Sequence, residues 1–489
     1  MRLSLAIVLA YGTSLIFGSL LLAQDDVTTR NGSSAVDGGW ITGPASNPLS
    51  FLNGPEYRTF GSTAAYDFPD FHPASSLDEK LPRWIDIEAE ERFRFEGYRN
   101  GSFQVGNDDN YMLNRLRLQV DLRPVPWVRF SLQTQDARPI LQKPPIGPPN
   151  ENEWDLKLAY AEFGDPEQQW ISLRIGRQLI NYNNTLIANS EWRNQGRSYD
   201  AAVVNLQKGR YHLGVFAASA VVPLAAGISH HQEGNNIYGA YGRIDSAIPK
   251  STLEPFVLWR VQPSAVVEPA VSSGKAKQDL KAFGIRWKGM VKTAFDYSAE
   301  GVIENGNVGQ DRIEGWATTD GIAYQKSSLW GKPRAYAQFD YASGNSNSSQ
   351  GVHRTFDTIY PTAHDRFGIL DVFGWQNIKS IRGGATIIPY RRWTVTAQYL
   401  DLWLAQANDA VYNSSGTSIG RGNAAFGTHL GAEGDFYSWF EFNRHFNVGA
   451  GFGRISADEL LSHLAGAQAY SSYYVALNFK DNGRWGAKE

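Results

Sequence analysis

Apolar and polar residues alternate along many short stretches of this chain. Between positions 114 and 123, every second residue is Leu or Val, and the residues between them are Asn, Arg, Gln or Asp. The stretch 127–135 repeats the alternation. Because successive side chains of a strand point to opposite faces, each stretch predicts a strand with one apolar and one polar face. We expect the following residues to share the apolar face: Leu116, Leu118, Val120, Val128, Phe130 and Leu132.

Eighteen such stretches can be marked along the chain, and the lengths of their connections alternate between short and long. The connections at 124–126, 207–210 and 389–391 are short, whereas those at 136–153, 179–196 and 343–370 are long. Short periplasmic turns and long outer loops alternate in outer-membrane barrels. The expected strands are 83–97, 111–123, 127–135, 154–164, 170–178, 197–206, 211–220, 235–244, 253–261, 280–288, 292–304, 312–324, 333–342, 373–387, 392–404, 426–441, 446–455 and 469–480.

The predicted fold is therefore all-β: a transmembrane antiparallel β-barrel of about 18 strands. A mean hydropathy of −0.37 excludes a bundle of membrane helices, and an aromatic content of 13% suits two interfacial girdles. A propeller would show a fixed repeat of roughly forty residues, and the sequence has none. Aromatic residues at the strand ends are expected in the girdles, with sugar platforms as the alternative: Trp127, Trp154, Trp170, Trp287, Trp393 and Tyr473.

The barrel is expected to occupy residues 83–480. Met1 and Arg2 precede a mostly apolar run up to Leu22, which predicts a secretory signal peptide at 1–23, with a membrane anchor as the alternative. Residues 24–82 are rich in Gly, Ser, Asn and Pro without periodicity, so we expect an irregular periplasmic segment there. Residues 481–489 form a polar tail after Phe479, the last strand aromatic.

The composition of the chain excludes several kinds of site and partner. The chain has no cysteine, which excludes disulfides and thiolate sites, and its net charge of −3 argues against nucleic acid as a partner. The adjacent His230 and His231 are expected in a solvated loop rather than at a metal. None of the 49 acidic residues is marked by context as an acid/base pair. We expect no catalytic residue, no metal and no cofactor, and hence not an enzyme.

Several local patterns, in their order of occurrence, resemble the alginate export family of outer-membrane porins. The resemblance runs from Arg83 to Phe479, most of the chain. The patterns that carry it are Arg115-x-Arg117, Trp127-Val128-Arg129, Asp136-Ala137-Arg138, Ala159-Tyr160-Ala161-Glu162-Phe163, Leu173-Arg174-Ile175-Gly176-Arg177-Gln178, Trp192-Arg193-Asn194, Arg197-Ser198-Tyr199-Asp200, Tyr360-Pro361-Thr362-Ala363-His364, Asp371-Val372-Phe373-Gly374-Trp375-Gln376-Asn377 and Gly431-Ala432-Glu433-Gly434-Asp435.

The resemblance implies an eighteen-stranded barrel with an arginine-rich constriction for a secreted anionic polysaccharide. The alternation along the strands supports this implication for Arg115, Arg117, Arg129 and Arg174, because these four arginines fall on the polar faces of their strands. A ring of guanidinium groups would select uronate-type polyanions. The alternative is that these arginines pair with acids such as Asp121 and Glu162 to fill the bore. The predicted pore-lining residues are Arg115, Arg117, Arg129, Arg174, Arg138 and Arg193.

Two further features are expected from the sequence. Arg177 falls on the apolar phase, where a charge at mid-bilayer costs about 2–4 kcal/mol, so we expect it at the strand end or beyond a bulge. The segment 343–370 is expected on the extracellular side or inside the bore, either as a gate or as an idle surface loop.

The predicted function is a monomeric channel of the bacterial outer membrane that exports an alginate-like anionic polysaccharide. Its partners would be the polymer or small anionic solutes, outer-membrane lipid and periplasmic secretion proteins. One alternative is an uptake porin for small anions or organic acids. An alternative of another class is a secreted β-rich polysaccharide-binding protein or lyase, which would bury its apolar face between two sheets.

Overall fold

The protein is described by a computed structural model. It covers residues 73–146, 149–165, 169–182, 186–247, 250–267, 274–291, 294–347, 351–362, 364, 366–443 and 445–481. The signal peptide predicted at 1–23, most of the segment 24–82 and most of the tail 481–489 lie outside these residues. At 73–78 the short helix α2 (Pro73–Asp78) precedes the barrel, and Asp78 accepts a hydrogen bond from the backbone N–H of Ile87 at 2.9 Å.

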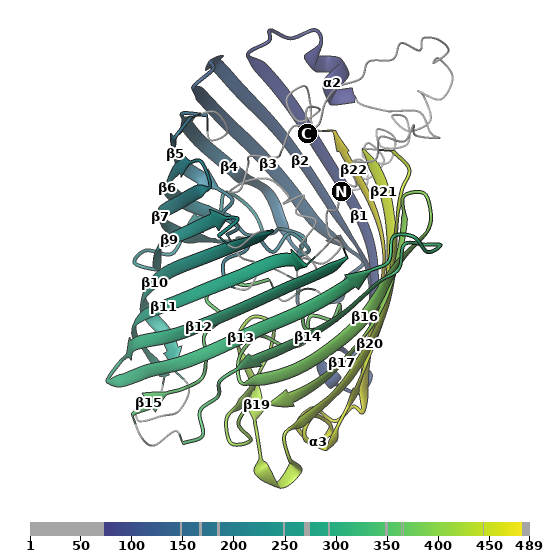
Figure 1. The fold of residues 1–489 in the computed structure, drawn as a ribbon. Coiled ribbons are helices and arrows are strands. Elements are labelled where there is room, and N and C mark those ends of the chain that lie inside the picture. The colour runs from purple at the N-terminus through teal and green to yellow at the C-terminus, as the bar shows by residue number, and fades with distance from the viewer. Residues whose placement is uncertain are drawn as a thin grey trace. The chain divides into compact units, whose positions relative to one another are not determined.

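Eighteen of the described strands form one closed antiparallel barrel, in which each strand pairs with its neighbour along the chain (Figure 1). The first strand pairs with the last, with Ala89 opposite Asp481, so the sheet has no free edge. The barrel strands are β1 (Ile85–Arg99), β2 (Asp109–Val125), β3 (Val128–Ile140), β4 (Asn152–Phe163), β5 (Ile171–Gln178), β6 (Tyr199–Lys208), β7 (Tyr211–Val222), β9 (Asn236–Asp245), β10 (Ser251–Val267), β11 (Gly274–Val291), β12 (Phe295–Val308), β13 (Asp311–Gln325), β14 (Arg334–Ala342), β16 (Ile378–Tyr390), β17 (Trp393–Leu404), β20 (His429–Glu441), β21 (Phe446–Ala457) and β22 (Ala469–Asp481).

The two ends of the barrel differ as the connection lengths predict, except that β12 and β13 are joined by only two residues at the long-loop end. The turns after β2, β6 and β16 consist of two residues each, whereas β14 and β16 are separated by residues 343–377. The long connections contain the strands β8 (His230–His231), β15 (Val352–His353), β18 (Ala410–Tyr412) and β19 (Ser418–Arg421), the helix α3 (Glu459–Ala465) and the 3₁₀ turns η2 (Gly101–Phe103) and η3 (Ala424–Phe426). Within the described residues, no helix is long and apolar enough to cross a bilayer.

The alternation along the strands sorts side chains as predicted, with one exception. Leu118, Val120, Phe130 and Leu132 are exposed on the outer face, and Leu116 on the same face is half-buried. Val128 was expected to face lipid, but it is buried, at 8% exposure. It lies opposite Val125 on one strand and Phe163 on the other, and both of these residues are exposed.

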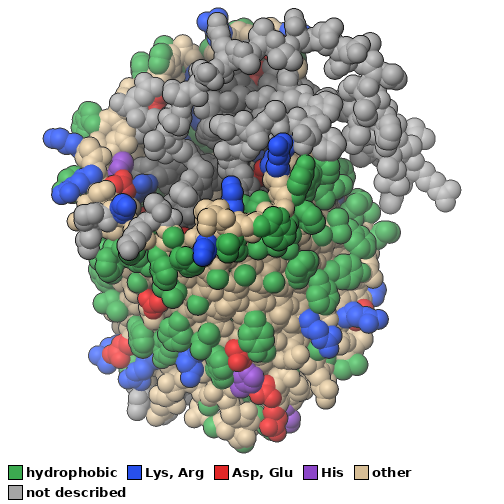
Figure 2. Space-filling model, turned by 45° about the vertical axis from the view of Figure 1, so that its right-hand side comes forward, with side chains coloured by type: hydrophobic (Ala, Val, Ile, Leu, Met, Phe, Trp, Pro, Cys, Tyr) green, Lys and Arg blue, Asp and Glu red, His purple; other side chains and the backbone are tan. Residues whose placement is uncertain are grey.

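The outer face carries an apolar belt. Figure 2 shows hydrophobic side chains gathered across one side of the barrel, with Lys and Arg side chains above and below them. The six aromatic residues predicted for the girdles are all exposed, from Tyr473 at 38% to Trp170 at 68%. An apolar belt between charged borders with aromatic residues at its edges is the surface that a bilayer requires.

Two long connections fold inward rather than outward. Residues 179–198, between β5 and β6, contact the inner faces of β1, β2 and β4. Residues 343–377, between β14 and β16, contact the inner faces of β10, β12 and β20. Their apolar residues, among them Ile187, Phe356 and Trp375, belong to one buried cluster inside the barrel. This confirms, for the part of the segment 343–370 that the structure describes, that it enters the bore.

Candidate functional site: a cationic wall inside the barrel

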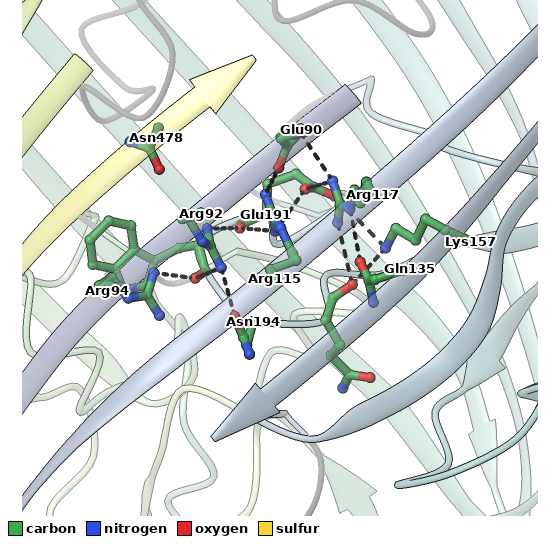
Figure 3. A network of polar contacts seen from close by, with 12 residues as sticks. Glu90, Arg92, Arg94, Arg115, Arg117, Gln135, Lys157, Glu191, Asn194 and Asn478 are labelled. Atoms are coloured by element: carbon green, nitrogen blue, oxygen red, sulfur yellow. Dashed lines mark hydrogen bonds and ion pairs between the residues drawn. The ribbon is translucent and has the colours of Figure 1, made fainter. Parts of the chain in front are cut away.

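Five buried cations line one side of the bore and are called here the cationic wall (Figure 3): Arg92 and Arg94 on β1, Arg115 and Arg117 on β2, and Lys157 on β4. The positions of the arginines follow from the strand pattern, because they alternate with Phe93 and Phe95 on β1 and with Leu116 and Leu118 on β2. Lys157 lies at a register shift between β3 and β4, where a β-bulge leaves both Lys157 and Leu158 buried.

The cationic wall holds the inward segment 179–198 by its backbone. Arg92 donates hydrogen bonds to the carbonyl oxygens of Glu191 at 2.9 Å, Trp192 at 3.2 Å and Arg193 at 2.9 Å. Arg94 donates to the Trp192 carbonyl at 2.6 Å, and its guanidinium lies 4.1 Å from the centre of the Trp192 ring. Lys157 donates to the carbonyl of Gln195 at 2.9 Å.

One carboxylate of that segment enters the centre of the cationic wall. Glu191 Oε2 lies 2.6 Å from Nη1 of Arg117 and 3.3 Å from Nη1 of Arg115, and Glu191 Oε1 lies 3.8 Å from Nζ of Lys157. Burial would raise the pKa of Glu191, but Arg117, Lys157 and Arg115 outweigh it and lower the pKa from 4.5 to about 2. Glu191 is therefore an anion bound by three cations.

Carboxylates of the strands also meet the cationic wall. Glu90 pairs with Arg115, Glu96 pairs with Arg94, and Glu191 is shared as described. Because the bore is lined by low-dielectric protein, a cluster of cationic side chains there raises the local concentration of anions.

The second inward segment is bound on another side of the bore. Asp357 pairs with Arg260 of β10 and accepts two hydrogen bonds within the barrel interior, while its backbone N–H donates to Glu304 at 2.9 Å. Burial would raise the pKa of Asp357, but Arg260 holds it below its usual range. The backbone N–H of Leu370 donates to Glu433 of β20 at 3.2 Å. The segment is thus held by acidic as well as basic residues on the inner face of the barrel.

Four of the six predicted pore residues point into the barrel. Arg115 and Arg117 belong to the cationic wall. Arg129 pairs with Asp121 at 2.7 Å, and Arg174 donates to Glu162 at 3.0 Å. The pairing with Asp121 and Glu162 was the alternative raised from the sequence, and it is present for these two arginines. Arg129 retains 21% of its side-chain exposure, the largest of the four.

The other two predicted residues lie elsewhere. Arg138 is in phase with Leu132 on β3, so it lies on the outer face, where it pairs with Asp136 at 2.8 Å and Glu153 at 3.0 Å. Arg193 lies in the inward segment and donates to Ser415, in the turn between β18 and β19, at 3.2 Å. It connects two loops rather than standing on the barrel wall.

Arg177 lies at the end of β5, as expected from its apolar phase. It forms a two-point pair with Asp200 of β6, at 2.8 and 3.1 Å, and donates to the carbonyl of Leu156 at 3.1 Å. The preceding Gly176 has φ +122°, and a Cβ there would lie 2.3 Å from the carbonyl oxygen of Ala159. A glycine is therefore required at this close approach of β4 and β5.

Sequence reasoning missed Arg92, Arg94, Lys157 and Glu191. Arg92 and Arg94 alternate with Phe93 and Phe95, which is the same signal that identified Arg115 and Arg117. Lys157 is displaced by a bulge, and Glu191 lies in a connection without periodicity, so neither carries a strand-phase signal.

One group of acids has the spacing of metal ligands within the described residues. Carboxylate oxygens of Asp86, Glu88 and Asp121 lie within 4.8 Å of one another. Asp121 already accepts two hydrogen bonds from Arg129, at 3.0 and 2.7 Å. His230 and His231 are exposed in β8, and Nδ1 of His231 lies 2.8 Å from Asp200.

A sequence profile described as alginate export matches residues 83–471, which include the whole cationic wall. The chain belongs to the alginate export family. No curated protein matches the sequence.

Solved structures place the alginate export chain in a known architecture. The porin OccAB2 of Acinetobacter baumannii superposes with a TM-score of 0.55 at 10% identity, covering 81% of this chain and 97% of the porin. OccK9 (OpdG) of Pseudomonas aeruginosa gives 0.55 at 10%, covering 81% and 98%. The outer membrane protein OpdK of Pseudomonas aeruginosa gives 0.54 at 12%, covering 81% and 98%. At such identities the likeness concerns the fold alone.

Family and fold together establish the class of this protein. It is a β-barrel channel of the bacterial outer membrane, with its short turns on the periplasmic side and its long connections on the extracellular side. The secreted binding protein or lyase considered from the sequence would bury its apolar face between two sheets, whereas here the apolar face is turned outward on a closed barrel.

Proposed function

We propose that the bore exports an anionic polysaccharide whose sugars carry carboxylates, of the alginate type, and that the protein does no covalent chemistry. The observation that carries this proposal is the position of Glu191. Its carboxylate lies between Arg115 and Arg117, 3.3 and 2.6 Å from them, where a uronate carboxylate would make the same charge-assisted hydrogen bonds. Glu191 thus acts as a resident stand-in for the carboxylate of the polymer.

The remaining partners of the cationic wall suit an exchange of anions. Arg92 donates to three carbonyl oxygens of the inward segment, and Lys157 donates to a fourth. A carboxylate adds the attraction of a full opposite charge to a guanidinium or ammonium group, which a neutral carbonyl does not offer. A polymer carboxylate can therefore compete with a carbonyl for these cations, and the segment 179–198 yields its place as the polymer advances.

Other arginines extend the path toward the periplasmic end. Arg129 lies near the start of β3 and Arg174 near the start of β5, closer to the short turns than the cationic wall. Both guanidinium groups approach the ring of Tyr160, at 5.9 and 4.6 Å from its centre. A polyanion entering from the periplasm would meet Arg129 first and the cationic wall afterwards.

The test is ion selectivity in planar bilayers. The purified wild-type channel should prefer anions under a salt gradient, the preference should weaken as salt rises, and uronate oligomers should block the current from at least one side. Arg117→Gln together with Arg129→Gln should move the reversal potential toward cations and raise the blocking concentration at least tenfold. A cation-selective wild type, or a double variant with unchanged selectivity, would refute the proposal.

Arg138→Gln is the matched control for this experiment. Arg138 lies on the same strand as Arg129 but on the outer face, and it is paired with Asp136 and Glu153. Its replacement removes one positive charge, as each substitution of the double variant does, without changing the bore. We expect its selectivity and its block by uronate oligomers to equal those of the wild type.

The length of the blocking oligomer separates export of a polymer from uptake of small organic acids. A polymer path binds several sugars at once, so block should strengthen steadily from two to about ten uronate units, as expected for linked binding sites. A channel for small acids would conduct a single uronate and show no such dependence on length. Periplasmic secretion partners are part of the proposal and would be identified by cross-linking at the short turns.

A further inference from the structure

A groove lies on the outer, membrane-facing side of β6, β7, β9 and β10, which run side by side in Figure 1. Its volume is about 550 Å³, within the range of about 300–1,000 Å³ that small-molecule sites occupy. Small residues form its floor and two aromatic rings form its wall. The outward-facing residues that line it are Ala202, Val204, Val215, Ala217, Tyr238, Ala240, Val257 and Trp259.

The register orders this groove into rows that cross the strands. Ala202, Ala217, Tyr238 and Trp259 form one row, and the next row toward the short turns contains Val204, Val215, Ala240 and Val257. The rings of Tyr238 and Trp259 lie 5.1 Å apart. The hollow arises because alanines occupy positions where the rest of the belt carries larger side chains.

The row on the extracellular side of the groove is polar. It begins with the Arg177–Asp200 pair, continues with Ser219 and Asn236, whose side-chain oxygens lie 2.6 Å apart, passes the apolar Val261 of β10 and ends with Asp279. Asp279 accepts a hydrogen bond from the indole N–H of Trp259 at 3.1 Å. The groove is therefore open to hydrocarbon along its length and ends at a charged border.

That border is cationic on β11. Going inward from the extracellular end, the outer face of β11 presents Lys275, Lys277, Asp279 and Lys281, and then the apolar Phe283. Lys281 pairs with Asp279 at 2.8 Å and lies 5.7 Å from the centre of the Trp259 ring, beside the groove. Among the residues that the structure describes, Lys275 and Lys277 are exposed and have no ion-pair partner. These three lysines are called the lysine ledge.

We propose that the groove and the lysine ledge bind a phosphorylated, acylated lipid of the outer leaflet. One acyl chain lies in the groove between the aromatic wall and the alanine floor, and the phosphate is held by the lysine ledge at the level of the head groups. Charge complementarity selects this occupant, because a neutral protein surface would match the alanine floor but would offer no counter-charge to the lysine ledge. The site is independent of what passes through the bore.

The experiment is native mass spectrometry of the full-length channel in detergent with added lipid A, which is both phosphorylated and acylated. We expect the wild type to retain one lipid A molecule. Replacing Lys275, Lys277 and Lys281 by Gln should lower the retained fraction at least fivefold, as should Ala217→Trp, which fills the groove. Lipid A stripped of its phosphates should be retained at least fivefold less by the wild type.

Two control variants test whether a loss of lipid A is specific to the groove and the lysine ledge. Lys326→Gln with Lys332→Gln removes exposed lysines from the turn between β13 and β14, and Ala450→Trp enlarges an exposed alanine on β21, away from the groove. Both should retain lipid A as the wild type does. Heat-modifiable gel mobility and conductance identify variants that are folded. If Ala217→Trp does not assemble, the lysine variant still tests the proposal.

Three outcomes would overturn this proposal. The first is a wild type that retains no lipid A. The second is folded groove and ledge variants that retain as much lipid A as the wild type. The third is a wild type that purifies as a dimer which Ala217→Trp separates, because the groove would then be an interface between copies of the chain.

Discussion

The indole ring of Trp192 lies flat against the imidazole ring of His364, with ring centres 4.0 Å apart and planes 9° from parallel. Trp192 belongs to the segment held by the cationic wall, and His364 belongs to the segment tied to β10, β12 and β20. His364 is also held by Asp371, whose carboxylate lies 3.0 Å from Nδ1. The stack thus joins two inward segments that are anchored on different parts of the wall.

Removing this stack should favour conformations in which the two segments separate. Aromatic pairs contribute about 0.5–1.5 kcal/mol beyond area burial, so Trp192→Ala should raise the population of separated segments about fivefold. Single-channel recordings should show more frequent excursions to higher conductance. Trp154→Ala, at an exposed aromatic residue on the outer face, is the control and should record like the wild type. Identical traces for both variants would show that the stack does not restrict the bore.

The ionisation of Glu191 predicts a pH dependence of the inward segment. A carboxyl whose pKa is lowered in the folded protein contributes stability above its ordinary pKa and loses it as the pH falls through the folded value. For Glu191, docking of the segment 179–198 should therefore weaken as the pH falls from 4.5 to about 2. Conductance should rise across that window. Glu191→Gln should be more open at neutral pH and should lack this response, and a wild-type response retained by the variant would contradict the assignment.

Depth in the membrane predicts the cost of a charge on the outer face. Leu118 lies inside the apolar belt, and Trp127 lies at the short-turn border; both are exposed. An arginine near mid-bilayer costs about 2–4 kcal/mol, and one near the interface costs about 0–1 kcal/mol. Unfolding by denaturant in lipid vesicles should therefore show a clear loss for Leu118→Arg and little loss for Trp127→Arg. Equal losses would mean that Leu118 does not face the hydrocarbon core.

Arg177 and Asp200 should behave as a unit. Asp200→Leu leaves the Arg177 guanidinium without its two-point partner beside the apolar belt, and an unsatisfied charged group costs more than about 1–3 kcal/mol when buried. The double variant Arg177→Leu with Asp200→Leu removes both charges. We expect the double variant to be more stable than Asp200→Leu alone in the same unfolding assay. Additive losses would exclude coupling between the two side chains.

Strand phase allowed much of this protein to be predicted from its sequence. The eighteen strands, the parity of their connections and the inward direction of Arg115 and Arg117 all follow from a period of two residues. The same period places Arg138 with Leu132 on the outer face, although the family resemblance grouped it with the pore residues. Whether a single residue faces inward or outward must therefore be counted from residues of the same strand whose direction is known.

The binding partners of the cationic wall could not be predicted in this way. Glu191 reaches Arg117 across 74 positions of the sequence, through a connection without periodicity. Such contacts depend on how a long segment packs against several strands at once, which no local pattern records. The buried side chain of Val128 is a smaller case, because strand phase gives the direction of a side chain but not how far the surrounding structure covers it.

The pairing of Ala89 with Asp481 has a consequence for how the protein is made. Every other seam in the barrel joins neighbours along the chain, but this seam can form only after the whole barrel sequence has left the ribosome. Until the seam forms, β1 and β22 are two open edges with unpaired backbone groups, which lipid does not tolerate. Insertion into the bilayer is therefore coupled to closure of the seam between the first and last strands.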